Sequence, residues 1–154
     1  MKLVKVSELF EVKYGVNLEL NKLVEDPKGI NFVSRSAVNN GVSAKVARIK
    51  GIKPIDAGML TVAGGGSVLE TFYQPEPFYS GRDLYYLKAL TPMTVEQKLF
   101  YCMCIRANKY RYSYGRQANR TLRDIEIPAL SEIPKWVKTT RPKIIKEWQE
   151  LLSS

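Results

Sequence analysis

Short runs that alternate apolar and polar residues fill the first ninety positions and predict a domain made mainly of strands. The runs are rich in β-branched and aromatic side chains, and Gly, Pro or Asn bounds most of them. Asn39-Asn40-Gly41 predicts a tight turn, because Asn and Gly tolerate a positive φ. The predicted strands cover residues 29–34, 42–53 (one or two strands), 59–63, 67–73 and 83–88, after a short helix over 7–10 and a strand that ends at Tyr14-Gly15.

Helical periodicity begins only after Pro92. Thr94 and Gln97 have the spacing of a capping box, in which each side chain satisfies a backbone group of the other residue. The apolar stripe that follows consists of Val95, Leu99, Cys102 and Met103. It ends before Arg106. Residues 124–127 alternate again and predict a last strand.

Together these elements predict a single mixed α/β (α+β) domain, β-rich in its first half, with a central helix and a short C-terminal helix. We assign residues 1–128 to this domain. Residues 129–139 carry prolines without a clear period and predict an extended connector, and residues 140–154 predict an amphipathic helix. That helix either packs on its own domain or docks on a partner. Its candidate partner contacts are Ile144, Trp148 and Leu151.

Composition excludes several kinds of chemistry. The chain has no His, which removes the usual Ser-His and Cys-His nucleophile pairs. Cys102 and Cys104 lie two apart on the predicted helix, so they point in different directions and are too few for a zinc site. No apolar run reaches the roughly 18 residues of a membrane span, and the N-terminus lacks a signal-peptide core. We therefore expect a cytoplasmic protein without a zinc site and without a His-activated nucleophile.

Positive charge is concentrated in two stretches of the chain. The sequence contains 24 basic and 15 acidic residues, a formal net charge of +9. Residues 27–55 and 97–123 together hold thirteen of the basic residues and none of the acidic ones. A solvated surface without a dedicated partner mixes the two signs, so this segregation indicates a polyanionic partner.

The second acid-free stretch interleaves Arg and Lys with Tyr, Asn and Gln between Arg106 and Arg120. Arg and Lys suit phosphates or guanine edges, and Asn and Gln suit adenine. Tyr hydrogen-bonds phosphates or stacks on bases. The candidate nucleic-acid contacts here are Lys109, Arg111, Tyr112, Tyr114, Arg116, Gln117, Asn119 and Arg120.

The first acid-free stretch supplies a second candidate surface around the predicted Asn-Gly turn. Its candidate contacts are Arg35, Ser36, Asn39, Asn40, Lys45, Arg48, Lys50 and Lys53. For Asn39 and Asn40, turn chemistry alone is an equally good explanation. Gly64-Gly65-Gly66-Ser67 lacks the Lys of a nucleotide-binding phosphate loop. A close backbone approach to a DNA phosphate stays open there, so Ser67 is also a candidate.

The order of these motifs resembles the target recognition domain of type I restriction–modification specificity subunits and related domains of type II enzymes. The likeness runs from Val6-Ser7-Glu8-Leu9-Phe10 to Ile125-Glu126-Ile127-Pro128. Between them lie Phe32-Val33-Ser34-Arg35-Ser36 with Asn39-Asn40-Gly41-Val42, Thr61-Val62-Ala63 with Gly66-Ser67-Val68, Phe78-Tyr79 with Asp83-Leu84-Tyr85-Tyr86-Leu87, and Gly115-Arg116-Gln117-Ala118-Asn119-Arg120. The chain departs from the pattern at Leu69 and over residues 128–134, which lack the family's usual lead into a long spacer helix.

The resemblance implies a non-catalytic domain that reads one half of a split duplex target. Such a domain delivers DNA to a methyltransferase subunit, with or without a restriction endonuclease subunit. S-adenosylmethionine would then bind the methyltransferase partner, and this chain would bind no cofactor. A homodimer through the C-terminal helix is a further arrangement that the sequence leaves open.

Other functions stay open at this point. A magnesium-dependent nuclease would use a carboxylate and a lysine, either Glu11 with Lys13 or Glu96 with Lys98. A module for single-stranded DNA or RNA would use the tyrosines interleaved with arginines for stacking. A module that binds an acidic protein finds support only in the charge.

Overall fold

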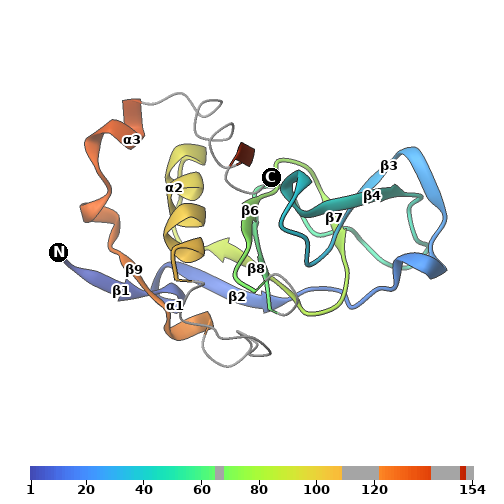
Figure 1. Ribbon diagram of the computed structural model, residues 1–154, viewed down its shortest axis with the longest axis horizontal. Helices are drawn as coiled ribbons and strands as arrows, with labels where there is room; N and C mark the ends of the chain where they lie inside the picture. The colour runs from blue at the N-terminus through green and yellow to red at the C-terminus, as the bar shows by residue number, and fades with distance from the viewer. Residues whose placement is uncertain (65–67, 109–121, 140–149, 152–154) are drawn as a thin grey trace.

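A computed structural model describes residues 1–64, 68–108, 122–139 and 150–151, which form three small sheets and one long helix (Figure 1). The strands are β1 Leu3–Lys5, β2 Phe10–Tyr14, β3 Glu25–Val33, β4 Val42–Val46, β5 Leu60–Ala63, β6 Thr71–Tyr73, β7 Phe78–Ser80, β8 Leu84–Ala89 and β9 Glu126–Pro128. The α-helices are α1 Val6–Leu9, α2 Val95–Arg106 and α3 Lys135–Thr139, and the short 3-10 helices are η1 Leu20–Lys22, η2 Asn39–Gly41, η4 Leu122–Asp124 and η5 Leu130–Glu132.

The central sheet has the strand order β2-β8-β5-β6, and each neighbouring pair is antiparallel. One row across it joins Val12 to Leu87, Leu87 to Leu60 and Leu60 to Tyr73. Val12, Leu60 and Leu87 of this row are buried. Sheet strands bury one face when their apolar residues align in this way, and α2 lies against this sheet (Figure 1).

α2 buries more of its surface than its apolar stripe predicts. Leu99 and Cys102 are buried as expected, and Tyr101 and Ile105 are buried as well. Tyr101 makes an edge-to-face contact with Phe10 at 5.7 Å between ring centroids, and its hydroxyl donates a hydrogen bond of 2.9 Å to the Pro128 carbonyl. The extra buried face arises because α2 packs against β9 and α3 as well as against β6.

A second sheet, β4-β3-β7, lies at the opposite end of the molecule from β1, β9 and α3 (Figure 1). β3 pairs antiparallel with β4 and parallel with β7, with Phe32 opposite Ala44 on one side and Tyr79 on the other. Phe32, Tyr79 and Val46 form the buried centre of a small apolar cluster beneath this sheet. The first acid-free stretch therefore has a hydrophobic support of its own.

Most of the predicted elements are confirmed, including the mixed, β-rich fold class. α1 runs directly into β2, and the Thr94–Gln97 capping box opens α2. Asn39 and Asn40 have φ values of 53° and 55°, which confirms the turn. Residues 42–53 form one strand, β4, followed by a loop, and residues 68–69 form a turn before β6.

Residues 129–139 differ from the expected extended segment. They contain η5 and α3, and Ile133 and Val137 are buried in the main core cluster. Packing against α2 accounts for the difference, because apolar side chains at these two positions gain burial that local periodicity does not reveal. The C-terminal helix predicted over 140–154 lies outside the described residues except for Glu150 and Leu151, which are helical.

Among the described residues, no helix combines the length and the apolar character that crossing a membrane requires.

Replacing Thr94 with Ala should lower the free energy of unfolding by about 1 kcal/mol. The Thr94 hydroxyl accepts the Gln97 N–H at 3.2 Å, while the Gln97 side chain accepts the Thr94 N–H at 2.9 Å. Urea denaturation measures the effect, with Thr91→Ala, at an exposed position just before the helix, as the matched control. Equal stability of the two variants would contradict a stabilising capping box.

Candidate nucleic-acid interface

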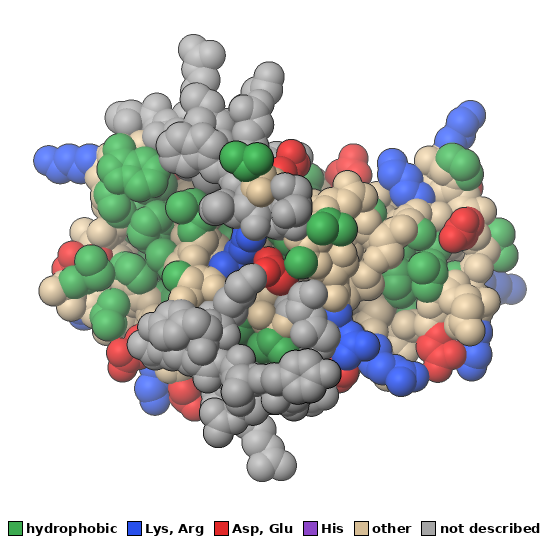
Figure 2. All heavy atoms as spheres, viewed as in Figure 1, with side chains coloured by type: hydrophobic (Ala, Val, Ile, Leu, Met, Phe, Trp, Pro, Cys, Tyr) green, Lys and Arg blue, Asp and Glu red, His purple; other side chains and the backbone are tan. Residues whose placement is uncertain are grey.

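The first acid-free stretch folds as β3, η2, β4 and the loop after β4. Its cationic candidates from β4 onward, Lys45, Arg48, Lys50 and Lys53, are all exposed. Figure 2 shows Lys and Arg side chains projecting around the end of the molecule that carries β3 and β4, with some acidic side chains among them. The fold thus presents these four cations to solvent.

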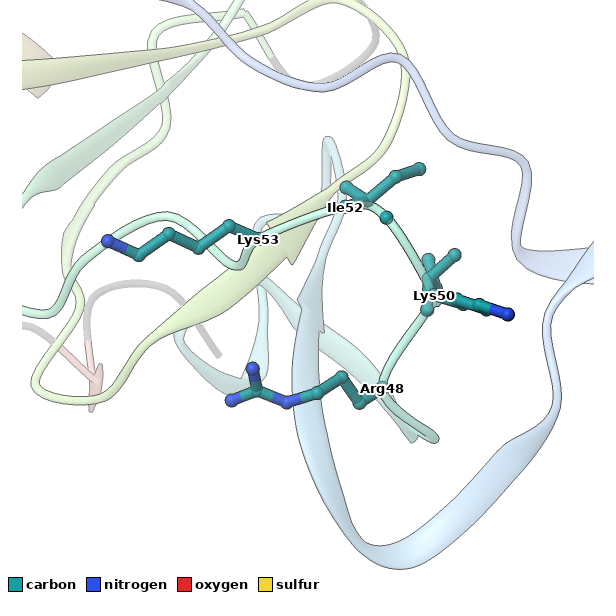
Figure 3. A pocket seen from close by; sticks show the side chains of 6 residues that line it. Arg48, Lys50, Ile52 and Lys53 are labelled. Carbon is teal, nitrogen blue, oxygen red and sulfur yellow. The ribbon is translucent and has the colours of Figure 1, made fainter.

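Residues 48–53, here called the basic loop, take their shape from a tyrosine beneath them. The Tyr79 hydroxyl accepts the Ile49 N–H at 3.0 Å and donates to the Ile52 carbonyl at 2.8 Å. The six residues of the loop line one shallow pocket (Figure 3). In that view Arg48 and Lys53 extend to one side of the loop and Lys50 extends to the other.

Arg35 belongs to a polar cluster at the ends of β2 and β3 and the start of β8. Its guanidinium lies 3.1 Å from an Asp83 carboxylate oxygen, and the Tyr14 hydroxyl donates to the other oxygen at 3.2 Å. The Asp83 N–H in turn donates to the Tyr14 hydroxyl at 2.9 Å. The Arg35 side chain is 35% exposed, and its bond to Asp83 uses one of five N–H donors. Arg35 is therefore held in place with donors left for a ligand.

The candidates around the turn have structural roles of their own. The Asn39 side-chain amide donates to the Val42 carbonyl and the Asn40 amide to the Tyr73 carbonyl, each at 2.9 Å. The Ser36 hydroxyl accepts the Val38 N–H at 3.2 Å. These bonds explain why the turn forms, and base contacts by the same residues stay a prediction.

Arg106 has a nearly buried side chain, unlike the exposed cations of the basic loop. Its Nε lies 3.2 Å from Glu70 Oε2, with side-chain exposures of 10% and 4%. Its guanidinium also lies over the Phe72 ring, 5.5 Å from the centroid. Through these contacts Arg106 connects the end of α2 to the segment that leads into β6. Its role is therefore structural.

The remaining candidates lie outside the described residues. For nucleic-acid contact these are Ser67, Lys109, Arg111, Tyr112, Tyr114, Arg116, Gln117, Asn119 and Arg120, and for partner contact Ile144 and Trp148. Leu151, the third partner candidate, is 73% exposed.

The sequence of this chain is similar to that of a known restriction-enzyme subunit. The chain is 30% identical over 118 residues to S.BcgI, the specificity subunit of a type II restriction enzyme from Heyndrickxia coagulans. The match covers 76% of this chain and 33% of that protein, so the chain spans about a third of its relative. No protein-family model matches the chain.

The solved structures agree with the sequence match. A type I restriction–modification S subunit from M. genitalium superposes with a TM-score of 0.65 at 16% identity, over 99% of this chain and 39% of that one. The HsdS subunit of Thermoanaerobacter tengcongensis superposes with a TM-score of 0.67 at 14% identity, over 98% of this chain and 38% of that one. A chain from a study of type I restriction–modification complex assembly superposes with a TM-score of 0.67 at 15% identity, over 99% of this chain and 41% of that one. The chain has the fold of a specificity-subunit target recognition domain.

Of the residue pairs weighed for a nuclease, the structure gives contacts for Glu11, Lys13 and Lys98. Glu11 and Lys13 form an exposed ion pair with each other at 3.6 Å on β2. Lys98 donates to the Gly58 carbonyl at 3.0 Å and lies 5.9 Å from the Tyr73 ring centroid. Among the described residues, no three Asp, Glu, Cys or His side chains gather as a metal site would require.

The two cysteines are parts of α2 rather than reactive groups. Cys102 is buried in the core and Cys104 is half-buried. Burial raises the pKa of the Cys104 thiol to about 12, so this thiol stays protonated at neutral pH. A protonated thiol is a poor nucleophile, which agrees with the expected lack of cysteine chemistry.

Sequence reasoning missed Tyr14, Tyr79 and Asp83 as parts of the candidate interface. Tyr79 and Asp83 lie far along the chain from the segments that they hold, and only the pairing of β3 with β7 brings Tyr79 beneath the basic loop. The one local sequence signal is the position of Asp83, two residues after Gly81 and at the start of a predicted strand. In the structure its φ is 52°. A left-handed residue at such a place is worth inspecting as a structural or functional position.

Arg106→Met should lower the free energy of unfolding by about 3 kcal/mol or more, because it leaves the buried Glu70 carboxylate without its guanidinium. Lys22→Ala removes one partner of an exposed ion pair, Lys22–Glu19 at 3.2 Å, and should cost less than about 1 kcal/mol. Urea denaturation compares the stabilities of the two variants.

A double variant, Glu70→Leu with Arg106→Met, should lose less free energy of unfolding than the sum of the losses of its two single variants. Additive losses, or equal losses at Arg106 and Lys22, would show that the buried pair is not coupled.

Proposed function

We propose that this chain binds double-stranded DNA in a sequence-specific manner, as the target recognition domain of a restriction–modification system. Two observations of different kinds support the proposal. The relative with 30% identity is a restriction-enzyme specificity subunit, and the fold matches type I S subunits over nearly the whole chain. The fold also exposes a run of cations between residues 27 and 55, where the sequence has no acidic residue.

The chemistry of the first acid-free stretch suits the phosphate backbone rather than stacking on unpaired bases. Stacking on unpaired bases needs exposed aromatic rings. Between residues 35 and 53 the structure exposes Lys45, Arg48, Lys50 and Lys53, whereas Tyr79 beneath them is buried. Cations without rings suit the phosphate backbone, which supplies much of the affinity for a duplex.

We assign the exposed cations to phosphate contacts and the polar residues near the turn to base contacts. Lys45, Arg48, Lys50 and Lys53 meet phosphates, while Arg35, Asn39 and Asn40 lie near base edges together with the polar residues of the second acid-free stretch. The chain itself catalyses nothing. It directs a DNA methyltransferase, which binds S-adenosylmethionine, and in some assemblies an endonuclease subunit. Partner contacts fall to the C-terminal residues Ile144, Trp148 and Leu151, through which the chain could also form a homodimer.

Selection of bound duplexes from a random library at low salt should enrich one short motif. Affinity for the enriched duplex should then fall with salt, with a log–log slope of about 0.9 for each phosphate contact. The matched control is the same duplex with its motif scrambled. A steep salt dependence without an enriched motif, or tighter binding to either single strand than to the duplex, would contradict sequence-specific duplex recognition.

A further inference from the structure

We infer that the basic loop, residues 48–53, is a preformed binding site for phosphates of the DNA backbone, and that Tyr79 is the positioning residue that fixes its shape. The inference rests on the proposed function and adds to it a separate source of affinity that carries no base specificity.

The loop is closed by one hydroxyl. Tyr79 Oη accepts from the Ile49 N–H at 3.0 Å and donates to the Ile52 carbonyl at 2.8 Å. The Ile52 N–H also donates to the Ile49 carbonyl at 3.2 Å. Both ends of this short turn are thus tied to a ring that is itself fully buried.

Apolar packing holds the loop from the same side. Ile49 and Ile52 pack against the cluster of Phe32, Val46 and Tyr79. Gly51, at the tip, has a φ of +83°, and nothing lies within 4 Å of the place where its Cβ would be. The two isoleucines therefore face the interior, and the tip faces open space.

The cations of the loop point outward and are available for a ligand. Within the described residues, neither Arg48 nor Lys50 has an ion-pair partner, and both are exposed. Lys53 lies 4.0 Å from Asp56, with side-chain exposures of 82% and 71%, and a pair so exposed is weak. Figure 3 shows that the three charges project on both sides of the loop, so they can meet more than one phosphate.

The composition of the loop fits phosphates and lacks the side chains that read adenine. Its side chains are those of Arg48, Ile49, Lys50, Ile52 and Lys53, with no Asn, Gln, Ser or Thr to hydrogen-bond adenine. Contacts to phosphate fix the register of a protein on DNA without reading sequence. A loop already held in shape loses little conformational entropy on binding, so each contact keeps more of its affinity.

The experiment combines duplex selection with salt titration on the whole chain. The double variant Arg48→Ala with Lys50→Ala should enrich the same motif as the unaltered protein. Between 50 and 200 mM salt its affinity should fall about tenfold less, the difference expected for two lost phosphate contacts. The control Lys2→Ala with Lys135→Ala removes the same charge from exposed positions at the opposite end of the molecule and should leave the salt dependence unchanged.

Tyr79→Phe tests the positioning role without emptying the core. It should speed hydrogen exchange of the Ile49 amide and weaken the salt dependence, again with the motif unchanged. Tyr86→Phe, at a half-buried tyrosine of β8, is the matched control. The exchange rate is read without DNA, so it separates loop geometry from binding.

Three results would overturn the inference. If the unaltered protein enriches a motif and the loop variants keep its salt dependence, the loop does not contact phosphates, and the proposed function stands without it. If the loop variants change the preferred base at any position, the loop reads bases. An unaltered protein that enriches no duplex motif would remove both the proposed function and this inference.

Discussion

Burial of the Tyr79 ring beneath the β4-β3-β7 sheet is the constraint on which the proposed interface depends. The ring fills the space next to Phe32 and Val46, and only its hydroxyl reaches the backbone of the basic loop. A buried hydroxyl must find hydrogen-bond partners, and this one finds a donor and an acceptor at the two ends of one turn. The same residue thus completes the core and shapes the surface above it.

Charge alone does not reveal which basic residues face a ligand. Arg106 and Arg48 both lie in acid-free stretches of the sequence. Arg106 is nearly buried against Glu70 and Phe72, whereas Arg48 is exposed on a loop. The partner of Arg106 lies 36 positions earlier in the chain, so local sequence could not show that this arginine is structural. Arg35 lies between these extremes, since Asp83 fixes it at a half-exposed position.

Features with a local physical cause could be predicted from sequence. The Thr94–Gln97 capping box, the positive φ values of Asn39 and Asn40 and most strand positions depend on residues within a few positions of one another. The loop after β4 was predicted as strand because its apolar residues alternate, yet Ile49 and Ile52 pack inward from a turn. The parallel pairing of β3 with β7, and the burial of Ile133 and Val137, depend on contacts distant in sequence.

The most direct test of duplex recognition maps the surface that DNA touches. Backbone amide signals of the labelled protein would be followed by NMR during titration with the selected duplex and with each of its single strands. The account predicts that the duplex shifts signals of residues 35–53, and that single strands at the same concentration shift them much less. Equal shifts with single strands, or duplex-induced shifts confined to β1, β9 and α3, would contradict it.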